Sequence, residues 1–466
     1  MSKSPKDAVT ALRRFGLGVR PDELSRIDSD PHGFVASQLD SRSSAIIGVA
    51  LPAAHERLGE IYRAERASRI TKSAVTDARA KSSGSTLLKP EAALPTPARL
   101  AREAFKAEVE ARVVHAVTTD APFIERLVLF WSNHFAVSAS KGIVRGIVGG
   151  FEREAIRPNV LGRFSDLVRA AAQHPAMLMY LDNVHSVGPK SDFGRKSGRG
   201  LNENLAREIL ELHTLGVSGG YSQADVRALA VLLTGWTVGN AASTKWVPGK
   251  FRFEPNWHEP GGALLLGRSY MQSGRAAGEA ALLDLARHPS TARNIAGKLV
   301  RHFVGDATTD GLVGKLERAF LDSDGDLATV MRALLEAREA WTAPQQKVVP
   351  PYDYMVSLVR GFAQVEPPIR LHQFAARLGH VTWSPTSPKG WPDGDQDWAG
   401  PAALRERLRI VEVFARKVAG TADPRSLADQ LLGAQLTPAT RTHIERAEAH
   451  IQGLVILAMS PEFLRR

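Results

Sequence analysis

The sequence predicts a mainly helical fold: an all-α, irregular array of many helices with one small β-hairpin. Long stretches, such as 97–118 and 122–134, repeat apolar residues with the period of an α-helix. Only one pair of short segments, 250–254 and 263–266, combines strand-forming residues with turn residues between them. No segment repeats at a fixed period, which argues against a solenoid or a propeller.

The first elements are read from local signals. A short helix is expected over 8–18, because Phe15-Gly16-Leu17-Gly18 provides glycines that can close it. Residues 1–70 are interpreted as the N-terminal helical segment of the main domain. Residues 71–97 are predicted to form an exposed, flexible excursion, since they contain Lys81-Ser-Ser-Gly-Ser and three prolines. Residues 98–466 are expected to form the main helical domain.

The remaining helices follow from apolar periodicity, and Pro175 should interrupt one of them. They are expected at 97–118, 122–134, 165–181, 202–214, 222–233, 291–303, 311–321, 326–338, 352–363, 402–418 and 436–459. Two segments rich in glycine and polar or proline residues, 183–200 and 383–401, are predicted to be loops.

Composition limits the classes of function. The 466 residues include 44% hydrophobic and 23% charged residues, which is typical of a globular protein. A net charge of +11 favours polyanions such as nucleic acid, anionic polysaccharide or an acidic membrane surface. The ordinary alternative is that arginines cover solvated helices. No specific nucleic-acid motif supports the first of these ligands.

The lack of cysteine and of long apolar segments further limits the chemistry and the location expected of the protein. The chain contains no cysteine, which excludes disulfides, thiolate nucleophiles and cysteine-ligated metals. No apolar core follows the first positive charges, so we expect no standard signal peptide and a cytoplasmic or periplasmic location. No run of about 18 apolar residues occurs, so no transmembrane segment is expected.

The helix expected over 202–214 carries the densest set of polar side chains. At about 100° per residue, one sector holds Glu203, Asn204, Arg207, Glu208, Glu211 and Thr214. On a solvated face, Glu203–Arg207–Glu211 would be an ordinary ladder of ion pairs. In a cleft, neighbouring carboxylates would repel and raise one pKa, as a general acid requires. Both interpretations remain open from the sequence.

Histidines and aromatic residues provide further candidates. His213 falls on the apolar side of this helix, where a core histidine is the ordinary interpretation; a metal site would need His134 and His258 as partners. The spacing does not match the Glu-x-x-His motif of di-metal bundles, so no metal ligand is predicted. Asn133 and His134 end an apolar helix, and they either cap it or face a cleft. Trp383, Trp391 and Trp398 share one loop, as a stacking platform or as core anchors.

The central segment, Leu201-Asn-Glu-Asn-Leu-Ala-Arg-Glu-Ile-Leu-Glu-Leu-His-Thr-Leu-Gly with Gly219-Gly-Tyr-Ser-Gln-Ala-Asp225-Val, closely resembles the hallmark of the domain-of-unknown-function 1800 family. Further landmarks, from about residue 8 onward, are Arg14-Phe-Gly-Leu-Gly18, Phe130-Trp-Ser-Asn-His134-Phe, Pro175-Ala-Met-Leu-Met-Tyr-Leu-Asp182, Leu233-Thr-Gly-Trp236, Phe253 with His258, and Pro388-Lys-Gly-Trp-Pro392. The resemblance implies a bacterial protein but no agreed activity. Many members carry export signals, and their genes often lie beside those of exported proteins that resemble sulfatases.

Three hypotheses of function follow. The first is an enzyme that uses carboxylate acid/base chemistry, a hydrolase acting on a carbohydrate or an anionic polymer and requiring no cofactor, with Glu203 and Glu208 as catalytic residues. Its substrate-binding candidates are Asn202, Asn204, Arg207, Glu211, His134, Asn133, His258, Trp236, Asp182 and Trp391. The second is a metal- or haem-dependent oxidoreductase using His134, His213 or His258. The third is a non-catalytic partner or scaffold of an exported protein.

Overall fold

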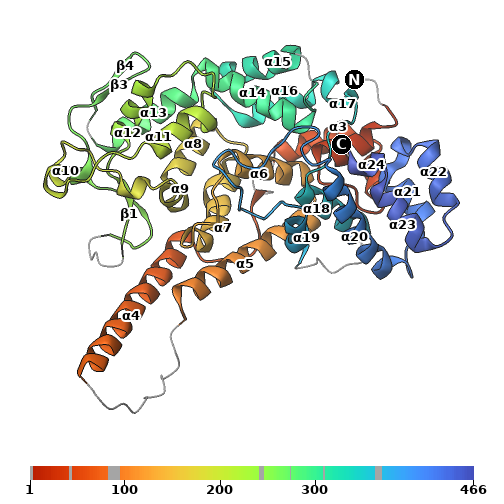
Figure 1. The fold of residues 1–466 in the computed structure, drawn as a ribbon. Coiled ribbons are helices and arrows are strands. Elements are labelled where there is room, and N and C mark those ends of the chain that lie inside the picture. The colour runs from red at the N-terminus through yellow and green to blue at the C-terminus, as the bar shows by residue number, and fades with distance from the viewer. Residues whose placement is uncertain are drawn as a thin grey trace.

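The computed structural model describes residues 4–40, 45–81, 95–240, 246–272, 274–307, 310–362 and 370–466 (Figure 1). Helices account for most of its regular structure, and the strands form two small antiparallel pairs. The predicted mainly helical fold with a small β-hairpin is therefore confirmed. Among the helices of these residues, none combines the length and apolar character needed to cross a membrane.

The N-terminal part consists of short helices, a two-helix arm and the central helix α6. Its helices are α1 (Asp7–Thr10), α2 (Glu23–Ile27), α3 (Pro31–Ser37), α4 (Ala54–Lys81), α5 (Pro97–Thr118), α6 (Pro122–His134) and α7 (Val148–Phe151). π-helical turns extend α1 and α7 over Ala11–Phe15 and Glu152–Ile156. The first helix ends at Phe15, at the start of the Phe15–Gly18 segment that was predicted to close it and before the predicted end at Gly18.

Helices α4 and α5 pack along each other and project from the main body as an arm (Figure 1). Helix α4 continues to Lys81, so the first part of the predicted excursion, 71–81, is helical, and the boundary expected at residue 70 falls inside α4. Residues 82–94 of that excursion lie outside the described residues. Helix α5 begins at Pro97 and is capped by Thr96, whose side chain accepts a hydrogen bond from the backbone N–H of Arg99.

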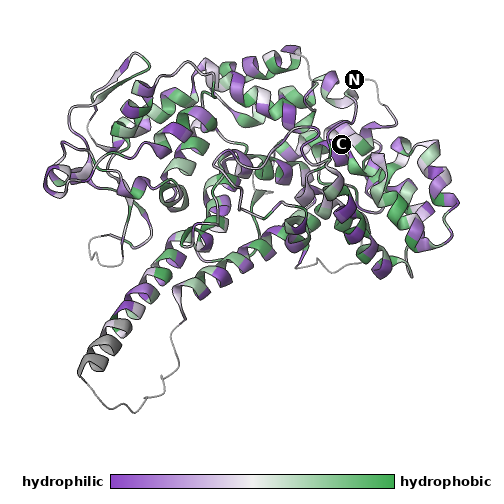
Figure 2. Cartoon of the chain, in the orientation of Figure 1, coloured by the Kyte–Doolittle hydropathy of each residue, from purple (hydrophilic) through white to green (hydrophobic). Residues whose placement is uncertain are grey.

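Helix α6 lies at the centre of the molecule. All of its residues are buried except Asn133, which is half-buried. Figure 2 shows hydrophobic residues gathered where the helices of the main body pack together, whereas hydrophilic residues alternate with them along the arm. Because nearly the whole helix is buried, the charged side chains that α6 contains must find partners inside the protein.

The middle of the chain forms a second group of helices and the four strands of the described residues. These elements are α8 (Phe164–Gln173), α9 (Pro175–Tyr180), α10 (Asp192–Ser197), α11 (Asn204–Glu208), α12 (Gln223–Leu232), β1 (Trp236–Val238), β2 (Phe251–Phe253), β3 (Ala263–Leu265) and β4 (Arg268–Tyr270). The helix predicted over 165–181 divides at Pro175, as expected. The short helix α10 lies inside the segment that was predicted to be a loop.

The predicted strand pairing was wrong. Strand β2 pairs with β1, with Thr237 opposite Arg252, and β3 pairs with β4, with Leu264 opposite Ser269. Strands β3 and β4 are joined by Leu266 and Gly267, both of which have positive φ. Two such residues form the tight turn that matches the twist of a hairpin, and leucine in the first position hid this signal.

The remaining elements are again helical. They are α13 (Arg275–Ala286), α14 (Pro289–Phe303), α15 (Asp310–Asp322), α16 (Leu327–Leu335), α17 (Arg338–Thr342), α18 (Pro351–Phe362), α19 (Leu371–Arg377), α20 (Pro401–Val418), α21 (Pro424–Leu432), α22 (Pro438–Glu445), α23 (His450–Met459) and α24 (Pro461–Leu464). The single helix expected over 436–459 is two helices, α22 and α23, which pack against each other and therefore need a turn between them. Similarly, 326–338 is divided between α16 and α17.

A fully buried ion network crosses the core beneath α6. Arg157 forms two hydrogen bonds to Glu125 of α6, at 2.6 and 2.9 Å, and one to Glu152 at 2.9 Å. Arg112 of α5 lies 3.0 Å from Glu152, which also accepts hydrogen bonds from Ser132 and Trp383. Despite burial, the charges of Arg112 and Arg157 lower the pKa of Glu152, so this carboxylate stays ionised.

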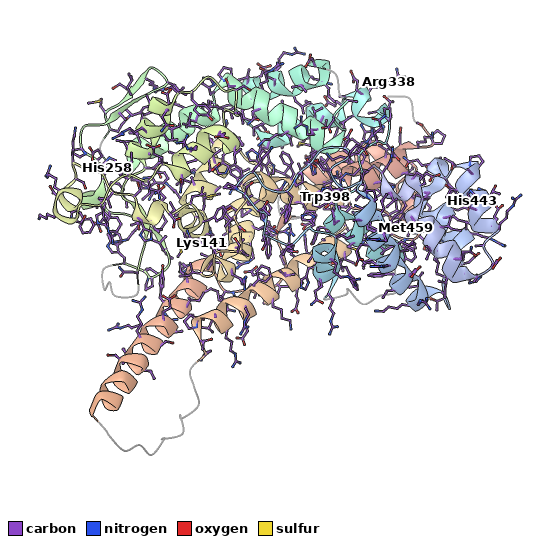
Figure 3. The ribbon with its side chains drawn as sticks, viewed as in Figure 1. Lys141, His258, Arg338, Trp398, His443 and Met459 are labelled. Atoms are coloured by element: carbon purple, nitrogen blue, oxygen red, sulfur yellow. The ribbon has the colours of Figure 1, made fainter. Side chains whose placement is uncertain are left out.

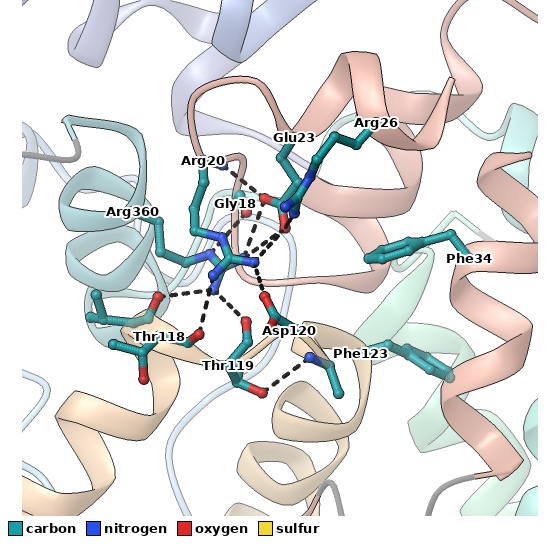
Figure 4. Close-up of polar contacts among 12 residues, drawn as sticks. Gly18, Arg20, Glu23, Arg26, Phe34, Thr118, Thr119, Asp120, Phe123 and Arg360 are labelled. Carbon is teal, nitrogen blue, oxygen red and sulfur yellow. Dashed lines mark hydrogen bonds and ion pairs between the residues drawn. The ribbon is translucent and has the colours of Figure 1, made fainter. Parts of the chain in front are cut away.

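A second buried charge joins segments that lie far apart in the sequence (Figure 4). The Arg360 guanidinium of α18 donates to the carbonyl oxygens of Gly18, at 3.1 Å, and Thr119, at 3.2 Å, and lies 3.4 Å from Glu23. Glu23 also accepts a hydrogen bond from Arg20 at 3.0 Å. These contacts connect the first loop, the end of α5 and α18, and burial lowers the pKa of Arg360 to about 10.

Candidate functional site

The central polar segment is not a uniform α-helix. Helix α11 is followed at once by a π-helical turn, Ile209–His213, and the Thr214 hydroxyl donates to the Ile209 carbonyl at 2.6 Å. A π-helical turn takes up an additional residue, which rotates every later side chain relative to an α-helical wheel. Thr214 was therefore wrongly placed in the polar sector: it is fully buried. His213 is buried, as its ordinary interpretation predicted.

Glu203, the first catalytic candidate, belongs to a surface ion pair. Its carboxylate accepts hydrogen bonds from Arg207 at 3.1 Å and from Gln223 at 2.7 Å. Both members of the Glu203–Arg207 pair are partly exposed, with side-chain exposures of 29% and 39%. An exposed i,i+4 pair of this kind contributes about 0.3–0.5 kcal/mol, which corresponds to the ladder interpretation.

Glu208, the second catalytic candidate, is half-buried next to Tyr180 and Glu211. Burial and the negative charge of Glu211 raise the pKa of Glu208, against the opposing effect of Arg207. Burial and the charge of Glu208 likewise raise the pKa of Tyr180. A neighbouring carboxylate thus contributes to raising the pKa of Glu208, which is the effect that the second interpretation of this helix requires.

A cleft of about 620 Å³ adjoins this segment, and we call it the outer cleft. It lies between the end of α6, the π-helical turn, α14 and the loop after Ser387. Its lining includes Asn133, His134, Glu211, Lys298, Lys389 and Trp391. Four of these six residues were site candidates from the sequence: Asn133, His134, Glu211 and Trp391. The structure brings them together from three distant parts of the chain.

Lys298 of α14 is the most unusual group in the outer cleft. Its ammonium donates to His134 Nδ1 at 3.3 Å and to the Leu212 carbonyl oxygen at 3.0 Å, and both acceptors are uncharged. Burial, together with the positive charges of Lys389 and Arg301, lowers the pKa of Lys298 to about 8. An ammonium carries three N–H groups, so one remains for a ligand.

His134 is held as a neutral imidazole. Its Nε2 lies 3.1 Å from the His213 carbonyl oxygen and must carry the proton there, since Nδ1 accepts from Lys298. Burial and the charge of Lys298 lower the pKa of His134 well below its usual value. Burial likewise lowers the pKa of His213 to about 3.

Asn133 fixes the loop that carries Lys389 and Trp391. Its side-chain amide donates to the Trp391 carbonyl oxygen at 2.9 Å, and its amide oxygen accepts from the Trp391 backbone N–H at 2.7 Å. Gly390 has a φ of +83°, and a Cβ atom there would lie 2.5 Å from the Asn133 carbonyl oxygen. Only glycine fits this close approach of the loop to α6.

Of the three tryptophans in the loop 383–401, two are core anchors and one is available for stacking. Trp383 donates to Glu152 at 2.9 Å and Trp398 donates to the Pro392 carbonyl oxygen at 3.2 Å, and both are buried anchors. Trp391 is only half-buried and lines the outer cleft, where its ring can stack on a ligand.

The other predicted site residues lie elsewhere. Trp236 is fully buried in the core. His258 bonds through Nδ1 to Thr234, at 3.0 Å from its carbonyl oxygen, and lies toward the end of the molecule with α10, whereas Trp398 lies near the middle (Figure 3). Asp182 pairs with Lys141 at 2.5 Å.

The residues that precede α11 support its first turn. Asn202 donates to the Asp182 carbonyl oxygen at 3.4 Å, and its side-chain oxygen accepts from the Asn204 backbone N–H at 2.9 Å. Asn204 itself is exposed. The Asn202 side chain thus satisfies a backbone N–H in the first turn of α11, which begins at Asn204.

The donor set for a metal is incomplete. The rings of His134 and His213 are 6.2 Å apart, but His258 contacts Thr234 and Phe253 instead. Within the described ranges, no three His, Asp or Glu side chains gather as a metal site would require.

Sequence reasoning missed Lys298. Asn294, Lys298 and Arg301 recur at i, i+4 and i+7 on α14, a spacing that places them on one face and could have drawn attention to them. Asn294 also contacts the central segment, donating to the Thr214 carbonyl oxygen at 2.7 Å.

Fold and site together define a mainly helical protein with a polar cleft at the end of its central helix. A family model described as "Protein of unknown function (DUF1800)" matches residues 10–465, so the chain belongs to this family and the resemblance noted in the sequence is confirmed. The chain matches none of the curated proteins and none of the solved structures.

Proposed function

We propose that this protein is an enzyme that works by acid/base chemistry in the outer cleft, as a hydrolase of a carbohydrate or an anionic polymer. The observation that carries the proposal is the environment of Lys298: a buried amine beside a cleft, with uncharged hydrogen-bond acceptors and a pKa near neutrality. Strongly perturbed groups that face a cleft are typical of functional sites.

The roles follow from which groups line the cleft. Glu211 replaces Glu203 as the leading carboxylate, since Glu211 lines the outer cleft and Glu203 is engaged on the surface. Glu208, which is not among the residues that line the outer cleft, is the second carboxylate candidate because its raised pKa suits a proton donor. The Lys298 ammonium, which lines the same cleft as Glu211 and donates to the Leu212 carbonyl oxygen, would bind an anionic group or protonate a leaving oxygen.

In the hydrolytic step, the Glu211 carboxylate would accept a proton from water as the water oxygen bonds to the electrophilic atom. The bond to the leaving oxygen would break, and that oxygen would take a proton from Lys298. Trp391 would provide a stacking surface for a sugar ring.

The test is activity on a panel of acidic and neutral polysaccharides, scored by the appearance of new chain ends. We expect Glu211→Gln and Lys298→Met each to lower the rate by 100-fold or more, roughly the contribution of one acid/base group. The matched control is Glu103→Gln, which removes one charge from an exposed i,i+4 pair on α5. Full activity in both cleft variants would place the chemistry elsewhere. If the wild type shows neither turnover nor saturable binding, a non-catalytic partner role is favoured instead.

A further inference from the structure

A smaller cavity adjoins the outer cleft, and we call it the inner chamber. It has a volume of about 70 Å³ and shares Phe130, Asn133 and the residues 391–393 with the outer cleft. His380, which also lines it, stacks on Trp398 with ring centroids 5.4 Å apart. The residues of interest come from the end of α14, the start of α18 and the loop after α19.

Three side chains of the chamber lining carry a polar atom with no hydrogen-bond partner among the described residues. These atoms are Tyr352 Oη, His302 Nε2 and Thr382 Oγ1. The three residues are 2%, 7% and 4% exposed, so bulk water does not satisfy them. Buried polar groups in native proteins nearly always have a partner, and three orphans around one cavity point to a missing occupant.

The charges of the lining are already compensated within the protein. Arg112 lies 3.0 Å from Glu152, and its guanidinium stacks over the Tyr352 ring at 4.6 Å. Asp393 lies 3.0 Å from the ammonium of Lys347 and 2.9 Å from His302 Nδ1. The groups that lack partners are therefore neutral, and an ionic ligand would bring an uncompensated charge into the core.

The Asp393 contact determines which His302 nitrogen is free to accept. An ionised carboxylate only accepts, so Nδ1 carries the proton and Nε2 presents its lone pair. Burial lowers the pKa of His302 to about 4, and burial raises the pKa of Tyr352, so both groups are neutral near neutral pH. The chamber thus provides a fixed acceptor together with the Tyr352 hydroxyl, a donor.

We propose that the inner chamber is a binding site for a small uncharged hydroxyl compound, which donates to His302 Nε2 and accepts from the Tyr352 hydroxyl. A hydroxyl group both donates and accepts, as these two atoms require. A cavity needs roughly 10–15 Å³ for one water, so this chamber admits a few waters or an organic molecule of similar size. The hydroxyl comes either from ordered water or from a small alcohol. This inference does not depend on the proposed function.

The first test compares two neighbouring tyrosines of α18. Tyr354 is a matched control: it is buried, has Arg407 stacked over its ring at 4.7 Å, and donates to the Ala458 carbonyl oxygen at 3.0 Å. Tyr354→Phe therefore loses a satisfied hydrogen bond. If the chamber is occupied, Tyr352→Phe loses one too, and both variants lower the Tm by about 1–2 °C.

An empty chamber predicts the opposite sign. Removing an unsatisfied hydroxyl relieves its desolvation, so Tyr352→Phe would then raise the Tm while Tyr354→Phe lowers it. That result overturns the proposal.

The second test identifies the source of the hydroxyl. A high-resolution crystal structure grown without organic additives should show an occupant within hydrogen-bond distance of His302 Nε2 and Tyr352 Oη. The Tm is then titrated with ethylene glycol. A saturable rise in the wild type that Tyr352→Phe abolishes assigns the site to a small alcohol. Ordered water without that rise assigns it to water, and a dry chamber refutes the proposal.

Discussion

Replacing Lys298 with methionine tests whether this buried amine is as uncompensated as its contacts indicate. The pKa of Lys298 falls from 10.5 to about 8 because the side chain is buried near two other cations. The unfolded chain therefore binds more protons than the folded protein between these two values. Wild-type stability should rise as the pH increases through this window, since the charged form is the one that burial penalises.

The full pKa difference corresponds to about 3 kcal/mol of stability. Lys298→Met removes this charge but also the hydrogen bonds to His134 and Leu212, at about 1 kcal/mol each. We therefore expect the variant to be about 1 kcal/mol more stable than the wild type near about pH 7, and about 2 kcal/mol less stable above about pH 10.

The assay is urea denaturation at both pH values, followed by tryptophan fluorescence. Other titrating groups cancel, because only the difference between variant and wild type is used. Lys417→Met, at an exposed position near the end of α20, is the control and should show no change of sign. An equal stability difference at both pH values for Lys298→Met would refute the reasoning, and with it the main support for the proposed site.

Three further predictions concern the surroundings of the site. Glu125→Gln breaks the buried contact with Arg157 and should cost about 3–5 kcal/mol in chemical denaturation; a loss below about 1 kcal/mol, as for an exposed pair, would contradict a tightly coupled network. Gly390→Ala should displace the loop from Asn133 and speed hydrogen exchange at the Trp391 backbone N–H, because a Cβ atom has no room at this positive φ; unchanged exchange would count against the close approach. In NMR spectra, His302 should remain neutral down to about pH 5, because burial lowers its pKa to about 4. Stability should fall as the pH drops from about 6.5 toward about 4, because in this range the unfolded chain binds a proton that the folded protein does not. Titration of His302 near the ordinary histidine pKa would show that the ring is not desolvated.

Helix bounds were predicted best where the signals are local. Helices α5 and α6 have the predicted bounds, because each begins with a proline in its first turn and has an apolar face that repeats with the helical period. The break at Pro175 was predicted for the same reason. These features depend on side chains within one or two turns of each other.

Pairing and turns between elements were predicted poorly. The partner of β2 is β1, which precedes it, and no local pattern in either strand indicates which segment it will meet. The division of 436–459 into α22 and α23 goes with their packing against each other. In each case a contact between separate elements decides the structure.

Local patterns along the chain were enough to indicate the family, the helical class of the fold and the polar residues of interest near the middle of the chain. Which of these polar residues share a cleft depends on contacts between elements that lie far apart in the sequence. The π-helical turn buries Thr214, and α14 brings Lys298 into contact with His134, from which it is separated by 164 positions in the sequence. The reason is physical: helical periodicity is a property of neighbouring residues, whereas burial, and hence the pKa of an amine or an imidazole, depends on everything that packs around it.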